Sequence, residues 1–308
     1  MQHINQCCAV NAINLISTAL LAAPNQTMDE GELVQTLNFY TTLIIQLNYS
    51  DYITLTQHGA IQQIHHAEAL GLVHRRKHVM GDFIYLDNAN ALLLTYYRNN
   101  IIHLLVLQSL IACCFINAAT LNREKIIRYI KIAYLFLKSE LFLPWTSAEL
   151  ETTVDNLLKH LSAGGILIYN EGAENYSKPP ISTEQHAQLF ILGQVISPVL
   201  ELYYMIFALL AEHGSNTLSR DYLEESCYLM AQRISLMYEI NSPDFFDKKL
   251  IANFINSLIK LGYVNVNDSD KLEISDFAVN EGRFARRMLD KNMQYHILQM
   301  LRTATESR

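Results

Sequence analysis

The histidines are the residues of this 308-residue sequence with the clearest potential for chemistry. A histidine can deprotonate a hydroxyl group when a nearby carboxylate fixes its tautomer, and the spacing H-x-x-x-x-D is one way to supply that pair. None of the 11 histidines has an aspartate five positions later. The nearest approach is His78 with Asp82, which is one residue too close and which we interpret as a turn between two short strands. The sequence therefore predicts no catalytic residue.

Other catalytic and metal-binding patterns are also missing from the sequence. There is no G-x-S-x-G elbow, no phosphate-binding loop of the Walker type and no G-x-G-x-x-G after a strand. His65, His66 and Glu68 lie close together but do not form H-E-x-x-H. The five cysteines form two adjacent pairs and a singleton without a C-x-x-C spacing, which fits a reducing compartment. We therefore expect no metal and no cofactor.

The composition is that of a folded protein with an acidic balance. Half of the residues are hydrophobic, only 17% are charged, and the net charge is −7. Binding nucleic acid over a broad surface needs a basic face, so we expect no nucleic-acid partner. The densest basic run, residues 74–78, is best interpreted as a solvated turn.

Two apolar stretches, 101–119 and 189–211, have about the length of a membrane span. Polar residues interrupt both of them, among them His103 and Gln108 in the first and Glu201 near the middle of the second. A charged residue at the centre of a bilayer is unfavourable, so we interpret both stretches as buried core helices. The first residues carry no basic segment before an apolar one, and we expect no signal peptide.

One structural unit recurs three times along the chain. An amphipathic helix ends at Gly71, at Gly164-Gly165 and at Gly262, and each time a short β-branched or aromatic run, a polar turn and a return strand follow. Glycine can adopt the left-handed conformation that ends a helix, so the pattern predicts three winged-helix-like β-hairpins. The expected fold is mainly α, a multi-helix arrangement with these three small hairpins.

The three units suggest a division into consecutive segments. Residues 1–95 are expected to hold the N-terminal helices and the first unit, and residues 96–182 the long helices and the second. Residues 183–308 are expected to hold further helices, the third unit and an amphipathic terminal helix. The fold alone does not fix a function.

Collinear segments make this sequence similar to one known family. The most unusual is 94–104, which contains T-Y-Y-R-N-N-x-x-H. K-x-E-L-F-L-x-W at 138–145 and the segments 9–15, 231–235 and 240–248 follow the same order as in the family. Together they resemble the C-terminal region of the bacterial sn-glycerol-3-phosphate acyltransferases (the GPAT/DHAPAT family). The sequence departs from the family at Gln108, where proline is usual.

The resemblance implies the activity of the whole enzyme. That enzyme transfers an acyl group from acyl-CoA or acyl-carrier protein to sn-glycerol-3-phosphate, giving lysophosphatidic acid for phospholipid synthesis at the cytoplasmic face of the bacterial inner membrane. Its H-x-x-x-x-D motif and glycerol-3-phosphate site precede the region that this chain resembles. We therefore expect the chain to support the catalytic acyltransferase domain, its partner, and to be inactive alone.

The sequence leaves two alternative functions open. One is a stand-alone winged-helix module with a regulatory or protein-binding role, and the other is a peripheral membrane protein anchored by its terminal helix.

Arg98 is the most suggestive residue of the resembling segments. A buried arginine paired with a carboxylate such as Glu140 is the interpretation that we favour, and a phosphate ligand is the alternative. The residues with a possible interface or phosphate-contacting role are Tyr96, Tyr97, Arg98, Asn99, Asn100 and His103. The expected structural anchors are Glu140, Trp145, Phe245 and Phe246.

Overall fold

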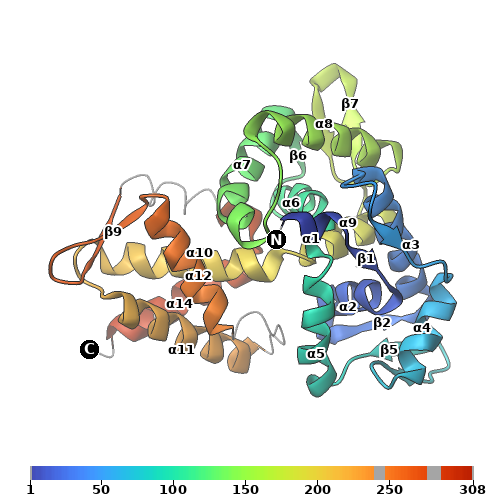
Figure 1. The fold of residues 1–308 in the computed structure, drawn as a ribbon, viewed down its shortest axis with the longest axis horizontal. Helices are drawn as coiled ribbons and strands as arrows, with labels where there is room; N and C mark the ends of the chain where they lie inside the picture. The colour runs from blue at the N-terminus through green and yellow to red at the C-terminus, as the bar shows by residue number, and fades with distance from the viewer. Residues whose placement is uncertain (1, 239–246, 276–285, 307–308) are drawn as a thin grey trace. The chain divides into compact units, whose positions relative to one another are not determined.

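The computed structural model describes residues 2–238, 247–275 and 286–306, and it is mainly α-helical with short strands (Figure 1). The mainly α fold expected from the sequence is confirmed. In the part of the chain that the structure describes, no single helix is long and apolar enough to span a membrane. One bent pair, Glu184–Gln194 with Ser197–His213, reaches that length and composition when both helices are counted together.

The chain folds into two compact units whose segments interleave. Unit 1 comprises Met1–Ala112, Ala119–Ile127 and Leu141–Ile196, and unit 2 comprises Cys113–Ala118, Arg128–Glu140 and Ser197–Arg308. The division into three consecutive segments stays a prediction.

Unit 1 is built around α2 (Ala12–Ala22), which is almost completely buried and packs against α3, α4, α5 and α9. The side chain of its N-cap, Asn11, accepts a hydrogen bond from the Asn14 N–H, and the Asn11 N–H donates to the Asn14 Oδ1. The other helices that lie wholly in unit 1 are α1 (Gln2–Gln6), α3 (Glu30–Leu47), α4 (Ala60–Ala69), α5 (Asn88–Asn99), α8 (Ser147–Ala163) and α9 (Glu184–Gln194).

Unit 2 is built around α10 (Ser197–His213), which is buried along most of its length. It packs against α11 (Arg220–Tyr238), α12 (Lys248–Lys260) and α14 (Lys291–Glu306). An aromatic cluster fills this core, with Tyr203 stacked on Phe254 at 3.8 Å between ring centroids. Two helices continue from one unit into the other, α6 (Val106–Cys114) and α7 (Arg123–Glu140).

The two apolar stretches form core helices in the structure, as expected, but neither is a single helix. Residues 101–119 contain a 3-10 turn at Ile102–Leu104 before α6. Residues 189–211 are divided between α9 and α10, and the second helix begins at Ser197 with Pro198 in its first turn. Proline lacks an N–H and is tolerated there, which explains why the helix starts anew at this point.

The three expected hairpins are present. They are β4 (His74–Arg76) with β5 (Phe83–Tyr85), β7 (Ile168–Asn170) with β8 (Asn175–Ser177), and β9 (Val264–Val266) with β10 (Leu272–Ile274). Two of them gain a third strand from an earlier part of the chain, β2 (Thr27–Asp29) on β5 and β6 (Thr120–Asn122) on β8. A parallel pair joins β1 (Ala9–Val10) to β3 (Thr54–Leu55).

The helix that precedes each hairpin ends in the same way. Gly71, Gly165 and Gly262 have φ values of +67°, +71° and +72°. The N–H of the next residue then reaches back to a carbonyl of the last helical turn, for example from Leu72 to Ala67 at 3.0 Å. This Schellman geometry needs the left-handed conformation that glycine adopts without strain. It explains why one sequence pattern gives three similar units.

Candidate functional site

Helix α5 carries four of the six residues with an expected interface or phosphate-contacting role, Tyr96, Tyr97, Arg98 and Asn99. Asp87 caps its start by accepting a hydrogen bond from the Asn90 N–H at 2.7 Å, and the helix ends at Asn99. Its two faces differ: Ala91, Leu94 and Arg98 are buried, whereas Leu92, Leu93, Tyr96 and Asn99 are exposed. The predicted site residues are therefore divided between the interior and the surface.

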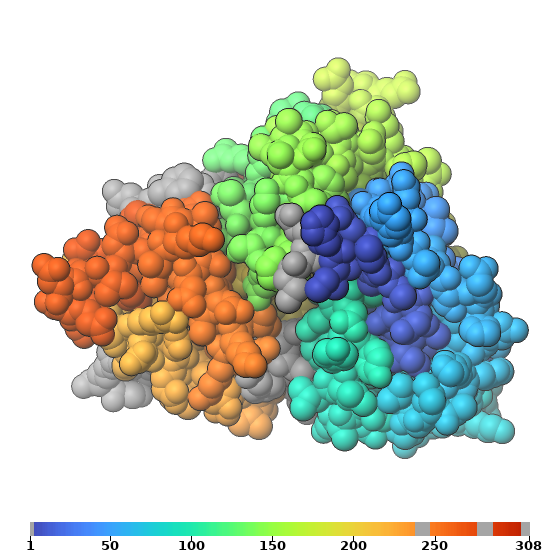
Figure 2. Space-filling view, in the orientation of Figure 1, coloured from blue at the N-terminus to red at the C-terminus, as the bar shows by residue number. Residues whose placement is uncertain are grey.

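The N-terminal segment binds the C-terminal end of α5. The Asn14 Nδ2 donates to the Tyr97 carbonyl at 2.8 Å, and the Cys8 thiol donates to the Asn100 carbonyl at 3.3 Å. Carbonyl groups in the last turn of a helix need partners from outside the helix, and these side chains supply them. In the space-filling view, the dark-blue N-terminal segment lies against the teal segment near residue 100 (Figure 2). Two of the resembling segments thus meet.

Arg98 is buried, with an exposed fraction of only 4%. Its Nε and Nη2 atoms donate to the Asn99 Oδ1 at 3.2 and 2.8 Å. Glu140, the carboxylate suggested as its partner, accepts a hydrogen bond from the Tyr203 hydroxyl within unit 2. The pairing of Arg98 with Glu140 and the phosphate-contacting role of the α5 segment both stay predictions.

His103 is a buried, neutral histidine. Its Nε2 lies 3.2 Å from the Asn5 carbonyl, which can only accept, so this nitrogen carries the proton. Burial lowers the pKa of His103 to about 4, against a smaller opposing effect of the Asn5 carbonyl. The imidazole is therefore uncharged at neutral pH and cannot attract a phosphate as a cation.

Trp145 joins the same group of residues through Tyr49. The Tyr49 ring lies edge-on to both neighbours, at 5.2 Å from His103 and 5.4 Å from Trp145 between ring centroids. Asn5 adds a hydrogen bond from its Nδ2 to the Leu141 carbonyl at 2.8 Å. We call Asn5, Asn14, Tyr49, His103 and Trp145 the N-terminal junction, because they link three of the resembling segments inside unit 1.

The remaining segments that resemble the family belong to unit 2 or lie among residues that the structure does not describe. Ala231 and Ile234 are buried in α11, as expected for a packing helix. The two predicted anchors Phe245 and Phe246 lie outside the described residues.

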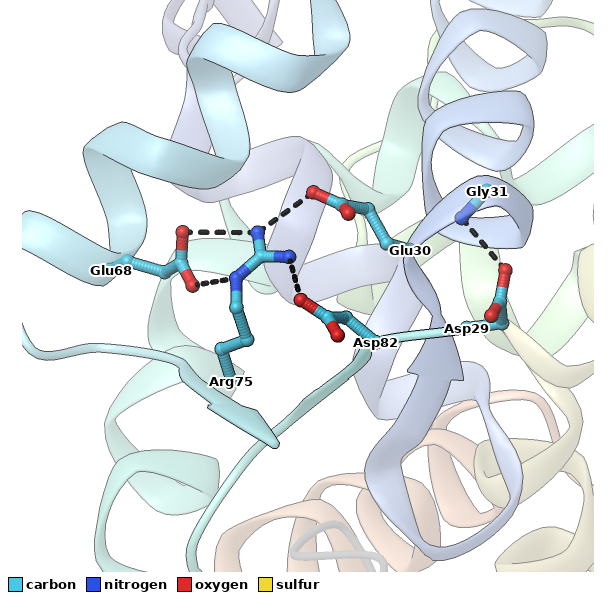
Figure 3. A network of polar contacts seen from close by, with 6 residues as sticks. All are labelled: Asp29, Glu30, Gly31, Glu68, Arg75 and Asp82. Atoms are coloured by element: carbon cyan, nitrogen blue, oxygen red, sulfur yellow. Dashed lines mark hydrogen bonds and ion pairs between the residues drawn. The ribbon is translucent and has the colours of Figure 1, made fainter. Parts of the chain in front are cut away.

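A second polar cluster was not foreseen from the sequence (Figure 3). Arg75 in β4 donates to Glu30 at 2.7 Å, to Glu68 at 2.7 Å and to Asp82 at 3.1 Å. Its guanidinium holds the pKa of Glu30 below the ordinary value, and the carboxylates raise the pKa of Arg75. We call these four residues the Arg75 network. It ties the start of α3 and the end of α4 to the first hairpin.

The interpretation of residues 74–78 as a solvated turn is therefore wrong for Arg75. Glu68 and Asp82 each lie seven residues from Arg75 and Glu30 lies 45 residues away, and no motif in the sequence marks any of the three as its partner. Arg76, Lys77 and His78 are exposed, as a turn requires.

One histidine does contact an aspartate. The His74 Nε2 and the Asp87 Oδ2 lie 3.0 Å apart, and both side chains are about half exposed. The Asp87 carboxylate already caps α5, and the Asn90 N–H lowers its pKa more than His74 does. We interpret this pair as a surface contact that supports the start of α5.

Unit 2 contains an apolar pocket beside its aromatic cluster. Its lining consists of Tyr129, Ile132, Ala133, Phe136, Leu200, Tyr203, Phe207 and Met288. Glu201, on the same helix as three of these residues, is buried and accepts a hydrogen bond from the Ser197 hydroxyl at 2.9 Å. Burial raises the pKa of Glu201 to about 7.

These contacts define a mainly helical region stabilised by partly buried hydrogen bonds and ion pairs, with three small hairpins. Residues 1–267 match the family described as the glycerol-3-phosphate acyltransferase C-terminal region. The chain belongs to this family.

Relatives named glycerol-3-phosphate acyltransferase support the assignment. The proteins from Pseudomonas savastanoi pv. phaseolicola and Pseudomonas syringae pv. syringae are each 36% identical to it over 301 residues, or 97% of this chain. The protein from Pseudomonas putida (strain W619) is 35% identical over the same length. The chain spans only 36% of the length of these relatives.

Proposed function

We propose that this chain forms the C-terminal region of an sn-glycerol-3-phosphate 1-O-acyltransferase and supports its acyltransferase domain. The observation that carries the proposal is the family match over residues 1–267 together with the names of the relatives. The whole enzyme would transfer an acyl group from acyl-CoA or acyl-carrier protein to glycerol-3-phosphate and release lysophosphatidic acid.

A supporting role rather than a catalytic one fits the chemistry of the described residues. The sequence contains no H-x-x-x-x-D spacing. His103 is uncharged and hydrogen-bonded to a backbone carbonyl, and His74 contacts an aspartate that caps a helix. The N-terminal junction holds the α5 segment in place, which is what a docking surface requires.

The exposed face of α5 is the surface that we propose for contact with the acyltransferase domain. Leu92 and Tyr96 are 69% and 67% exposed, and Leu93 lies beside them. Exposed apolar side chains that cluster on one helix often mark an interaction surface. Asn99 and Asn100 follow at the end of the same helix and are also exposed, so the surface would have a polar edge.

Association with the cytoplasmic face of the bacterial inner membrane is part of the same proposal. The product, lysophosphatidic acid, is a membrane lipid, so its synthesis is most direct at a bilayer surface. No observation favours the alternative of a stand-alone winged-helix regulatory module.

The test uses a fusion in which this chain replaces the matching region of the P. syringae relative. Arg98→Ala in that fusion should lower the folded yield or the activity by the equivalent of roughly 2–5 kcal/mol. The reason is that the buried group that pairs with the Arg98 guanidinium would be left without its partner. Arg220→Ala, which removes a surface ion pair with Glu224 in unit 2, is the matched control and should change little.

The kinetic constants separate the two roles of Arg98. A rise in the KM for glycerol-3-phosphate alone, with normal yield, would show that Arg98 is a phosphate ligand. Unchanged yield and unchanged kinetics would contradict both roles.

A further inference from the structure

The tip of the first hairpin exposes two apolar side chains almost completely. Val79 is 99% exposed and Met80 is 86% exposed. The Gly81 N–H donates to the His78 carbonyl at 3.2 Å, and the Met80 N–H donates to the His78 Nδ1 at 3.1 Å. These hydrogen bonds fix a turn that presents both apolar side chains to the solvent.

Basic residues directly precede these two apolar side chains in the hairpin. Arg76, Lys77 and His78 are all exposed. Within the described ranges, no carboxylate forms an ion pair with Arg76 or Lys77. The nearby acidic residues Glu30, Glu68 and Asp82 are already engaged by Arg75. The tip therefore combines two exposed apolar side chains with two positive charges that are available to a binding partner.

The base of the hairpin is anchored firmly enough to support such a contact. The Arg75 network ties β4 to α3 and α4 (Figure 3). The strand β2 pairs with β5 on its other side. The tip consequently projects from a fixed position, and little ordering is required when it binds.

The other two hairpins have different tips although the preceding helices end in the same geometry. The connection between β7 and β8 contains Glu171 and Glu174, and that between β9 and β10 contains Asp268 and Asp270. The fold therefore does not require an apolar and basic tip. Its presence on the first hairpin alone points to a binding partner with a negatively charged surface above an apolar interior.

We propose that this tip, defined as residues 76–80, inserts shallowly into an anionic phospholipid surface. Val79 and Met80 would enter the boundary of the acyl chains, and Arg76 and Lys77 would lie among the phosphate groups. The positive charges of Arg76 and Lys77 complement an anionic lipid surface locally, and they would have to offset the repulsion that the net charge of −7 of the whole chain produces. The inference rests on the proposed membrane association and does not require acyltransferase activity.

The test measures co-sedimentation of the purified chain with phosphatidylglycerol/phosphatidylethanolamine vesicles and with phosphatidylcholine vesicles. Binding should be weak, with half-saturation at lipid concentrations on the order of 1 mM, and should favour the anionic vesicles. The double substitution Val79→Asp with Met80→Asp should weaken it by roughly tenfold or more. Substituting Arg76→Gln and Lys77→Gln should weaken it by roughly fivefold for each charge, and added salt should reduce that difference.

Matched controls lie elsewhere on the surface. Val266→Asp on the third hairpin tests a half-exposed apolar residue, and Lys249→Gln with Lys260→Gln removes two exposed charges from unit 2. Both controls should retain binding to anionic vesicles. Circular dichroism should show that all variants stay folded, because the substituted tip side chains are exposed.

Three results would overturn the inference. They are equal binding to both kinds of vesicle, no binding of the wild-type chain at these lipid concentrations, and full binding by the Val79→Asp, Met80→Asp variant. In contrast, failure of the proposed acyltransferase role would appear only in the activity of the fusion enzyme. The two proposals can therefore fail separately.

Discussion

Replacing Arg75 by methionine removes a guanidinium that three carboxylates share, while most of the apolar stem of the side chain is kept. The Arg75 side chain is 20% exposed and those of Glu30, Glu68 and Asp82 are 23–33% exposed, so water screens the charges only in part. The substitution leaves three negative groups close together without a counter-charge.

The expected loss in the free energy of unfolding lies between two limits. Fully exposed ion pairs contribute about 0–1 kcal/mol each, whereas breaking a fully buried pair costs about 3–5 kcal/mol. For a partly buried network with three partners we expect a loss of about 2 kcal/mol at pH 7.

The pH dependence follows from the pKa of Glu30. Arg75 lowers this pKa below the ordinary value of 4.5, so the stabilisation is complete above that value and is lost as the pH falls through the folded-state pKa. The difference between wild type and Arg75→Met should therefore shrink below about pH 4.5. High salt should also reduce it.

Urea unfolding followed by tryptophan fluorescence measures this effect in unit 1. The chain has a single tryptophan, and Trp145 lies in that unit. Arg220→Met is the matched control, because it breaks one surface pair in unit 2 and should shift the Trp145 transition by only a few tenths of a kcal/mol. Equal stability of wild type and Arg75→Met, or a difference that persists unchanged at pH 3, would refute the electrostatic role of the network.

Three further substitutions test other features of the fold. Gly81→Ala should destabilise unit 1 by about 2 kcal/mol in the same urea assay, because Gly81 has φ +127° and a Cβ there would lie 2.6 Å from the Asp29 Oδ2. Asn14→Leu should destabilise it by about 2 kcal/mol, because it removes the hydrogen bond to the Tyr97 carbonyl and a helix cap; an unchanged urea midpoint would contradict this. Glu201→Gln should raise the thermal stability at pH 8 and should raise it much less at pH 5. The reason is that the folded-state pKa of Glu201 is raised to about 7. The ionisable carboxyl therefore destabilises the fold increasingly as the pH rises from its unfolded-state pKa towards 7. Circular dichroism melting curves that show the same gain at both pH values would contradict the pKa shift of Glu201.

Local patterns predicted much of the fold. The three hairpins could be foreseen because each depends on a glycine and on the alternation of residues within about 25 positions, as at Gly71 and Gly262. The added strands β2 and β6 could not be foreseen, because they pair with residues more than 50 positions away. A strand of only three residues shows too little alternation of apolar and polar residues to be recognised in the sequence. Asp29, for example, lies in β2, but an aspartate at that position is equally typical of a helix cap.

The candidate site was predictable to a smaller extent. The resemblance singled out His103 and Trp145, but their surroundings depend on Asn5 and Tyr49, which no motif marks. The neutral state of His103 follows from its burial, which the sequence does not give.

The most direct test of the supporting role is a comparison of acyl transfer by the purified chain and by the fusion with the P. syringae relative. Both are assayed with acyl-CoA and labelled glycerol-3-phosphate, and the lysophosphatidic acid formed is counted. We expect product from the fusion and none above background from the chain alone, because the chain has no H-x-x-x-x-D pair to activate the acceptor hydroxyl. Sustained turnover by the chain alone, in preparations cleared of contaminating enzyme, would contradict the supporting role, as would a folded but inactive fusion.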